Sequence, residues 1–159
     1  MKRIFLSVVT IAFILNASVA FASSHQAKTR KPGKRDAKII ADVRAVLDAQ
    51  VAAWNRGDIE GFMDGYARSD ETVFVSGDHV THGWQTVLER YKKGYDSREK
   101  MGHLDFSELE IKSLGRDTAV AMGRWQLTRA SDTPHGRFTL ILRRTPQGWR
   151  IIHDHTSSA

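Results

Sequence analysis

The hydrophobic pattern changes its period within the chain, and this change restricts the fold more than any other feature. Up to about residue 95, apolar residues recur every three or four positions in three segments, as on one face of a helix. From residue 103 onward they alternate with polar residues, as in strands. The pattern predicts helices over 36–56, 59–66 and 84–95, and strands over 72–76, 80–82, 103–114, 118–129, 136–145 and 149–157. Helices followed by a long antiparallel sheet predict a single α+β domain.

Turn residues support these boundaries. Gly57 can end the first helix in a left-handed conformation, and Asp58 can cap the second. The apolar phase of strand 103–114 shifts between Phe106 and Leu109, which predicts a β-bulge. The segment 145–148, with Pro146 followed by a glycine, predicts a tight hairpin turn between the last two strands.

The first 22 residues have the pattern of a cleavable signal peptide. Lys2 and Arg3 precede an apolar run over 4–15, and 20–22 reads Ala-Phe-Ala. An uncleaved anchor is the alternative, but the run is shorter than the roughly 20 residues that span a bilayer. We therefore predict an exported protein, periplasmic or secreted, that begins near Ser23. The chain has no cysteine, which excludes a lipoprotein, a disulfide and a thiolate metal site.

The positive charge is concentrated outside the domain. The whole chain carries a net charge of +6, but residues 39–159 carry −1. Residues 23–36 are predicted to form a basic, flexible leader ahead of a domain over 37–159. Such a leader is either a solvated spacer or an arm for anionic lipid or nucleic acid. We take it as a spacer, and predict no nucleic-acid partner and no stable membrane insertion after cleavage.

Two strand segments, 119–122 and 138–142, are apolar on both faces. Three helices can cover one face of the sheet, so the other face needs a different cover. This pattern predicts a homodimer.

Three motifs resemble one known superfamily. The segments 54–58 (WNRGD), 74–84 (FVSG, then HGW) and 148–157 (GWRIIHDHTS) resemble the nuclear transport factor 2-like superfamily. Within it, they look most like SnoaL-like bacterial proteins and the association domain of calcium/calmodulin-dependent protein kinase II. The resemblance covers residues 37–157. It implies a cone-shaped, cystatin-like fold, in which three helices pack inside a strongly curved, mainly antiparallel sheet. It also implies a pocket at one end and dimerisation through the convex face.

The resemblance implies four ligand-binding positions outside the last strand. Trp54 and Tyr66 would line the pocket wall and Trp84 would lie near its mouth, although Trp54 and Tyr66 also fit a plain apolar core. Arg124 matches an arginine that lines the pocket of the kinase association domain. The alternative for Arg124 is a structural ion pair with Asp154 or Asp105, because an unpaired buried charge is costly.

His153-Asp154-His155 is the most suggestive local motif. Alternation places the two histidines on one face of the last strand and Asp154 on the other. The predicted hairpin sets His153 opposite Ile141 and His155 opposite Thr139. By analogy with the kinase domain, His153 and His155 face the pocket as ligand-binding residues, with Asp154 as the competing candidate.

Other roles for this motif remain open. His153 or Asp154 would be the catalytic base if the protein is an enzyme. The pair of imidazoles could also be purely structural. A metal would need a third ligand such as His82, His103 or Glu108, and no spacing selects one. We therefore predict no metal and no cofactor.

The superfamily contains enzymes, binding proteins and assembly modules, so the fold does not decide the function. We expect an exported domain that binds a small organic molecule, anionic or carbonyl-bearing, facing Arg124. A ketosteroid-isomerase-like or cyclase-like acid–base enzyme is the first alternative; Tyr66 could donate a hydrogen bond, but no acid matches the catalytic base. A dimeric assembly module without a ligand is the second.

Overall fold

The structure is a computed structural model that describes residues 32–159. The predicted signal peptide and residues 23–31 of the predicted leader lie outside the described residues. Residues 34–36, assigned to the leader from the sequence, form the first turn of the first helix. The elements are α1 (Lys34–Asn55), α2 (Ile59–Met63), β1 (Val73–Ser76), β2 (His79–His82), α3 (Trp84–Gly94), α4 (Arg98–Met101), β3 (His103–Ser113), β4 (Thr118–Thr128), β5 (His135–Thr145) and β6 (Gly148–Thr156).

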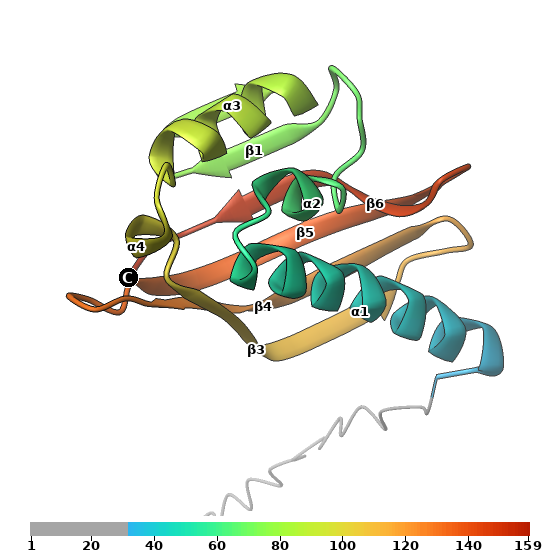
Figure 1. The fold of residues 1–159 in the computed structure, drawn as a ribbon. Helices are drawn as coiled ribbons and strands as arrows, with labels where there is room; N and C mark the ends of the chain where they lie inside the picture. The colour runs from blue at the N-terminus through green and yellow to red at the C-terminus, as the bar shows by residue number, and fades with distance from the viewer. Residues whose placement is uncertain (1–31) are drawn as a thin grey trace, which may run out of the picture. The chain divides into compact units, whose positions relative to one another are not determined.

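The six strands form one mixed sheet in the order β2-β1-β6-β5-β4-β3. Only β1 and β6 pair in parallel, and all other neighbours in the sheet are antiparallel. The sheet is curved, and α1 lies within its concave side against β3, β4 and β6 (Figure 1). The helix α3 packs on α2 and β2 at the other end of the sheet. The predicted α+β architecture is confirmed.

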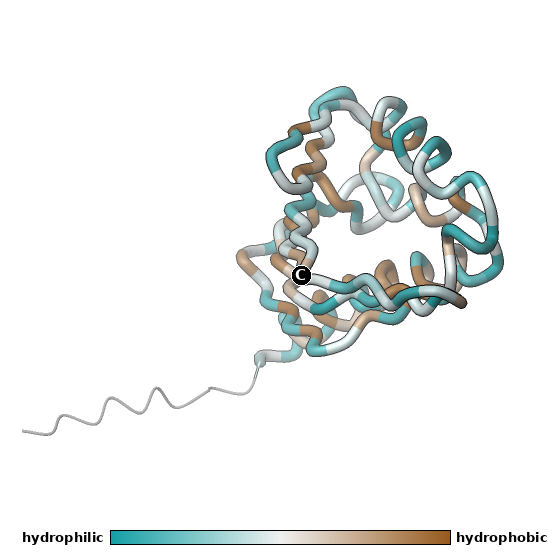
Figure 2. The backbone as a smooth tube through the Cα atoms, turned by 90° about the vertical axis from the view of Figure 1, so that its left-hand side faces the viewer, coloured by the Kyte–Doolittle hydropathy of each residue, from teal (hydrophilic) through white to brown (hydrophobic). Residues whose placement is uncertain are grey.

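The core lies between α1 and the concave face of the sheet. It includes Val43 and Leu47 of α1, and Ala119, Leu142 and Ile151 of the strands, all fully buried. Along the chain, hydrophobic and hydrophilic residues follow one another in short stretches (Figure 2). The alternation therefore directs one set of side chains into the concavity and the other set to the convex face.

Local turn chemistry agrees with the sequence. Gly57 has a φ of 87°, in the left-handed region. Asp58 caps α2, because its Oδ1 accepts a hydrogen bond of 2.7 Å from the backbone N–H of Gly61. The predicted bulge in β3 is present, with the register against β4 shifting between Ser107 and Glu110. Glu108 takes a φ of 51° there.

The predicted loop 96–102 differs from the structure, because it contains the short helix α4. Ser97 caps this helix by accepting a hydrogen bond from the backbone N–H of Lys100. Met101 is buried at its end. A cap and one buried side chain are sufficient to hold a single helical turn, and such a turn is too short to show a period.

The hairpin of β5 and β6 has the predicted pairing for a different reason. Thr145 pairs with Gly148, one residue tighter than the predicted register. The register then shifts by one at Ile152, so that His153 and His155 do face the β5 residues predicted for them. This bulge also changes which face each side chain takes, with consequences for the site.

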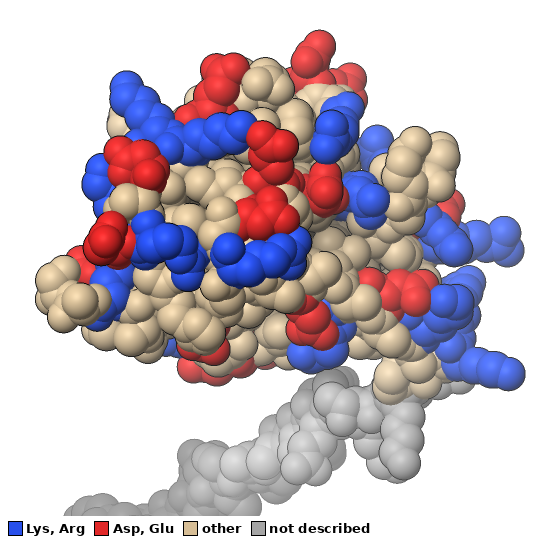
Figure 3. Space-filling model, viewed as in Figure 1, with Lys and Arg blue, Asp and Glu red and all other residues tan. Residues whose placement is uncertain are grey.

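Charges are mixed on the domain surface. Acidic and basic side chains are interspersed over the face in Figure 3, in keeping with the near-neutral charge of residues 39–159. No helix within residues 32–159 is long and apolar enough to cross a membrane.

Candidate functional site: an aromatic cavity with a buried carboxylate

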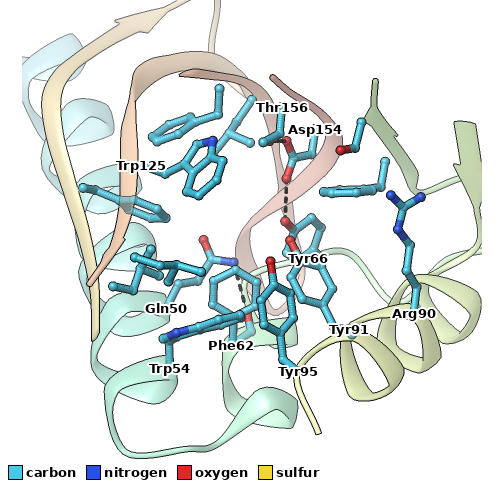
Figure 4. A pocket seen from close by; sticks show the side chains of 18 of the residues that line it. Gln50, Trp54, Phe62, Tyr66, Arg90, Tyr91, Tyr95, Trp125, Asp154 and Thr156 are labelled. Atoms are coloured by element: carbon cyan, nitrogen blue, oxygen red, sulfur yellow. Dashed lines mark hydrogen bonds between the residues drawn. The ribbon is translucent and has the colours of Figure 1, made fainter. Parts of the chain in front are cut away.

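A cavity of about 410 Å³ lies between the helices and the concave face of the sheet. Every layer contributes to its wall, and Figure 4 shows the side chains converging from the helices and strands. The wall includes Gln50, Trp54, Phe62, Tyr66, Phe74, Arg90, Tyr91, Tyr95, Leu104, Phe106, Trp125, Arg129, Phe138, Leu140, Asp154 and Thr156. Its size falls within the range of small-molecule sites.

Aromatic rings make up much of this wall and are locked in place. Trp54 contacts Phe62 and Tyr95, with ring centroids 5.2 and 4.7 Å apart and the rings in edge-on arrangements. The indole Nε1 of Trp54 donates to the backbone oxygen of Met101, at 3.1 Å. Trp125 is held in the same way by the backbone oxygen of Ser157. Because these N–H groups are used internally, both indoles offer the cavity only their apolar surface.

Asp154 is the buried acid of the cavity, with 4% of its surface exposed. The Tyr66 hydroxyl donates to its Oδ2 at 2.6 Å, and the Thr156 hydroxyl donates to its Oδ1 at 2.7 Å. Burial raises the pKa of Asp154 to about 6, although both hydrogen bonds act in the opposite direction. The carboxyl group therefore changes its protonation state close to neutral pH.

Two tyrosines accompany this carboxyl group. Burial raises the pKa of Tyr66 well above its ordinary value, and the negative charge of Asp154 raises it further. The same two causes raise the pKa of Tyr91. Figure 4 shows the hydroxyl groups of both tyrosines gathered beneath Asp154. Both phenols stay neutral near physiological pH, so they remain hydrogen-bond donors.

Gln50 is a polar wall residue that the sequence reasoning did not identify. It lies on the buried side of α1 with only 2% of its surface exposed. Its Nε2 donates a 3.0 Å hydrogen bond to the backbone oxygen of Phe62. The signal was available in the sequence, because Gln50 interrupts the apolar stripe that runs through Val43, Leu47 and Trp54.

Two arginines line the cavity. Arg90 donates to the hydroxyl oxygen of Thr81 at 3.0 Å, and its guanidinium lies over the ring of Phe74. Arg129 follows the end of β4. Burial raises the pKa of Tyr95, while the positive charges of Arg129 and Arg90 lower it. Tyr95 therefore lies in the field of both guanidinium groups.

The structure places Arg124, His153 and His155 away from the cavity, which corrects their predicted role. In β4, Trp125 points into the cavity, so its neighbour Arg124 points to the convex face. In β6, the bulge at Ile152 directs Asp154 inward and both histidines outward. Arg124 forms no ion pair with Asp154 or with Asp105; it lies opposite Arg137 of β5 instead.

The other predicted wall residues have mixed outcomes. Trp54 and Tyr66 lie in the wall of the cavity. Trp84 does not, because its indole turns back to α2, where Nε1 donates to the backbone oxygen of Met63 at 2.9 Å. The guanidinium of Arg68 lies over a face of the Trp84 ring, 4.4 Å from its centroid.

The side chains of the cavity can do two kinds of chemistry. They can bind the polar group of an apolar molecule through Tyr66 and Asp154, and Asp154 can give or take a proton near neutral pH. Within residues 32–159, no three His, Asp or Glu side chains converge as metal ligands would.

The comparisons with known proteins agree on the fold. The family model for the SnoaL-like domain matches residues 43–159. A crystal structure of an NTF2-like protein of unknown function from Shewanella oneidensis MR-1 is 39% identical, with a TM-score of 0.71, and the match covers 74% of this chain and 97% of that one. No curated protein matches the chain.

Two more distant structures show the fold alone. A calcium/calmodulin-dependent protein kinase II association-domain-like protein from Xanthomonas campestris is 19% identical, with a TM-score of 0.60 over 74% of this chain and 85% of that one. A ketosteroid isomerase-like protein from Erwinia carotovora atroseptica SCRI1043 is 21% identical, with a TM-score of 0.59 over 75% and 95%. On its matched length and on the closeness of the Shewanella structure, the chain belongs to the SnoaL-like domain family of the NTF2-like superfamily.

Proposed function

We propose that the protein binds a small, ring-containing organic molecule in the cavity, with a polar group of that molecule against Tyr66 and Asp154. The observation that carries the proposal is a mostly aromatic cavity with one hydrogen-bonded carboxyl group buried in its wall. A protein that used this space only as a core would fill it with side chains, since interiors are close-packed and each void reduces stability.

The residues around the cavity favour a carbonyl-bearing or anionic ligand. The protonated form of Asp154 can donate to a carbonyl oxygen, whereas the single proton of the Tyr66 hydroxyl is donated to Asp154. Arg90 and Arg129 supply positive charge for an anion. These groups take the role that the sequence assigned to Arg124.

A thermal melt with ring-containing fragments tests the proposal. A fragment present at about 100 times its Kd stabilises the folded state by about 2.7 kcal/mol, which raises the melting temperature by several degrees. The matched control is Leu140→Trp, which fills part of the cavity beside Asp154 with a bulky indole. We expect fragments to raise the melting temperature of the wild type only; equal shifts in both proteins would contradict binding in the cavity.

Acid–base catalysis is the second candidate function, and the environment of Asp154 favours it. A carboxyl group with a pKa of about 6 is suited to moving protons at neutral pH. It accepts a hydrogen bond from Tyr66, and the neutral phenol of Tyr91 in the same wall can donate to a developing enolate. The reaction class would be proton abstraction next to a carbonyl group.

We propose that a second copy of the chain covers the convex face of the sheet. Half-buried apolar side chains lie at its centre, including Val120, Met122 and Ile141. Exposed charges surround this apolar centre, and within one chain Glu108 pairs with Arg137 at 2.6 Å and Glu110 with Lys112 at 3.5 Å. The exposed residues that supply these charges are Asp105, Glu108, Glu110 and Lys112 on β3, and Arg137 and Arg143 on β5. The apolar centre therefore supports the proposal more than the charges do.

Export is also a proposal, supported by the charged start, the apolar run and the Ala-Phe-Ala site of residues 1–22. Mass spectrometry of the exported protein from its native host should find an N-terminus at or near Ser23. Exported protein that still carries Met1 would contradict cleavage of residues 1–22 as a signal peptide.

A further inference from the structure

The amide of Gln50 has a fixed orientation in the cavity wall. A backbone carbonyl can only accept a hydrogen bond, so the atom of Gln50 that meets the Phe62 oxygen must be the NH₂ group. The other atom, Oε1, is then an acceptor, and Figure 4 shows it pointing away from Phe62 into the cavity. Gly65 packs closely against this side chain: a Cβ at that position would lie 2.5 Å from the Gln50 Cδ.

This oxygen has no donor within the described part of the chain. None of the hydrogen bonds formed by residues 32–159 uses Gln50 Oε1, and the indole N–H groups of Trp54 and Trp125 donate elsewhere, to Met101 and Ser157. The ionised form of Asp154 presents further acceptor oxygens in the same cavity. An acceptor that faces the cavity and has no donor in the wall can bind a ligand that supplies an O–H or N–H group.

Another residue of the cavity wall, Arg129, has a hydrogen-bond donor without an acceptor among the described residues. The Nε of Arg129 is buried and has no hydrogen-bond partner within residues 32–159. The Nη1 of Arg129 forms an ion pair with the Asp132 carboxylate at 3.6 Å, which is longer than a hydrogen bond. The side chain is 23% exposed, so it lies nearer to solvent than Gln50. A guanidinium with unused N–H groups is well suited to bind a carboxylate.

We infer that the cavity selects a two-ended ligand: a ring system with a hydrogen-bond donor, a hydroxyl or N–H, facing Gln50 and an anionic group facing Arg129. The inference rests on the proposed function and narrows it to a chemical class, ring-containing hydroxy or amino acids. It also assigns the two ends to different residues, and each end can be tested separately.

Three probes separate the two ends. The first, 6-hydroxy-2-naphthoate, carries both groups; 6-methoxy-2-naphthoate has lost the donor; and 2-naphthol has lost the anion. Isothermal titration calorimetry of the purified protein at neutral pH gives the Kd of each probe. We expect the first probe to bind at least about tenfold more tightly than either of the others, since a hydrogen bond or a charge-assisted contact typically changes affinity by this much.

Two variants assign each preference to its residue. Gln50→Met keeps the length of the side chain and removes the acceptor, so the preference for hydroxy over methoxy should fall to near unity. The preference for naphthoate over naphthol should persist in that variant. Arg129→Met should give the reverse pattern. The effects are read as ratios between probes, so a general loss of stability cannot imitate them.

The outcomes distinguish this inference from the proposed function. If the probes bind in the cavity with equal affinity, or if each variant weakens all three probes alike, the two-ended selection is wrong while cavity binding stands. If neither these probes nor any ring-containing fragment binds to the wild type, both are wrong.

Discussion

Replacing Asp154 by asparagine is expected to stabilise the protein by up to about 3 kcal/mol at pH 8, because it removes a buried negative charge. Asparagine has nearly the same shape and its oxygen can still accept the hydrogen bond from Tyr66. Most substitutions of buried polar residues destabilise, so a gain of this size would be distinctive. It would mark Asp154 as a residue kept for function at the expense of stability.

The sign of the effect follows from the pKa. The folded state holds the Asp154 proton up to a pH of about 6, while the unfolded chain releases it near 3.8. Between these values the folded state binds more protons, so the contribution of Asp154 to stability falls as the pH rises. Below the lower value both states are protonated and the penalty disappears. Above the higher value both are ionised and the full penalty remains.

Urea unfolding of the wild type and Asp154→Asn between pH 4 and pH 8 measures this difference directly, because other titrating groups are common to both proteins. The difference in unfolding free energy between the two proteins should grow as the pH rises from 4 to about 6 and stay constant above that. A gap that does not depend on pH would show that Asp154 is not buried as an acid. If the protein is a catalyst, the wild type should catalyse hydrogen–deuterium exchange at the carbon next to the carbonyl group of an added ring ketone. The Asp154→Asn variant should lose this activity.

Introducing an aspartate at Ile141 is expected to abolish the dimer. Ile141 lies half-buried at the centre of the convex face, between Val120 of β4 and His153 of β6. An ionised carboxylate there would lose its water without gaining a partner. We expect the dimer to weaken at least about a hundredfold, so that light scattering at micromolar concentration changes from about twice the monomer mass to the monomer mass.

The control is the same class of substitution outside the face. Leu114 lies in the turn between β3 and β4 with 61% of its surface exposed. Leu114→Asp should leave the mass unchanged. A wild-type protein that is already monomeric, or an Ile141→Asp variant that stays dimeric, would show that this face does not join two copies.

The fold was predictable because its signals are local. Each signal lies within a few residues: the spacing of apolar residues, every 3.6 positions in a helix or every second position in a strand, a glycine at a helix end, and a phase shift in a strand. The bulge near Ser107 was visible because apolar residues lie on both sides of it and change phase. The bulge at Ile152 was not, because Ile151 and Ile152 are both apolar and conceal the change.

The site was less predictable because its contacts join distant parts of the chain. The hydrogen bond from Tyr66 to Asp154 spans 88 positions. The one-residue bulge at Ile152 decides whether Asp154 or its neighbouring histidines enter the cavity, since each step along a strand reverses the side chain. In β4 the resemblance favoured Arg124, but the large indole of Trp125 takes the concave side.

The most direct test of cavity binding is to identify what the protein carries when it is isolated from its native host. Protein purified without denaturation, alongside the Leu140→Trp variant, is extracted with solvent and the extracts are compared by mass spectrometry. We predict a ring-containing molecule in the wild-type extract, near one molecule per chain, that is depleted from the variant. A wild-type extract with no such molecule, or the same amounts from both proteins, would contradict a ligand in the cavity.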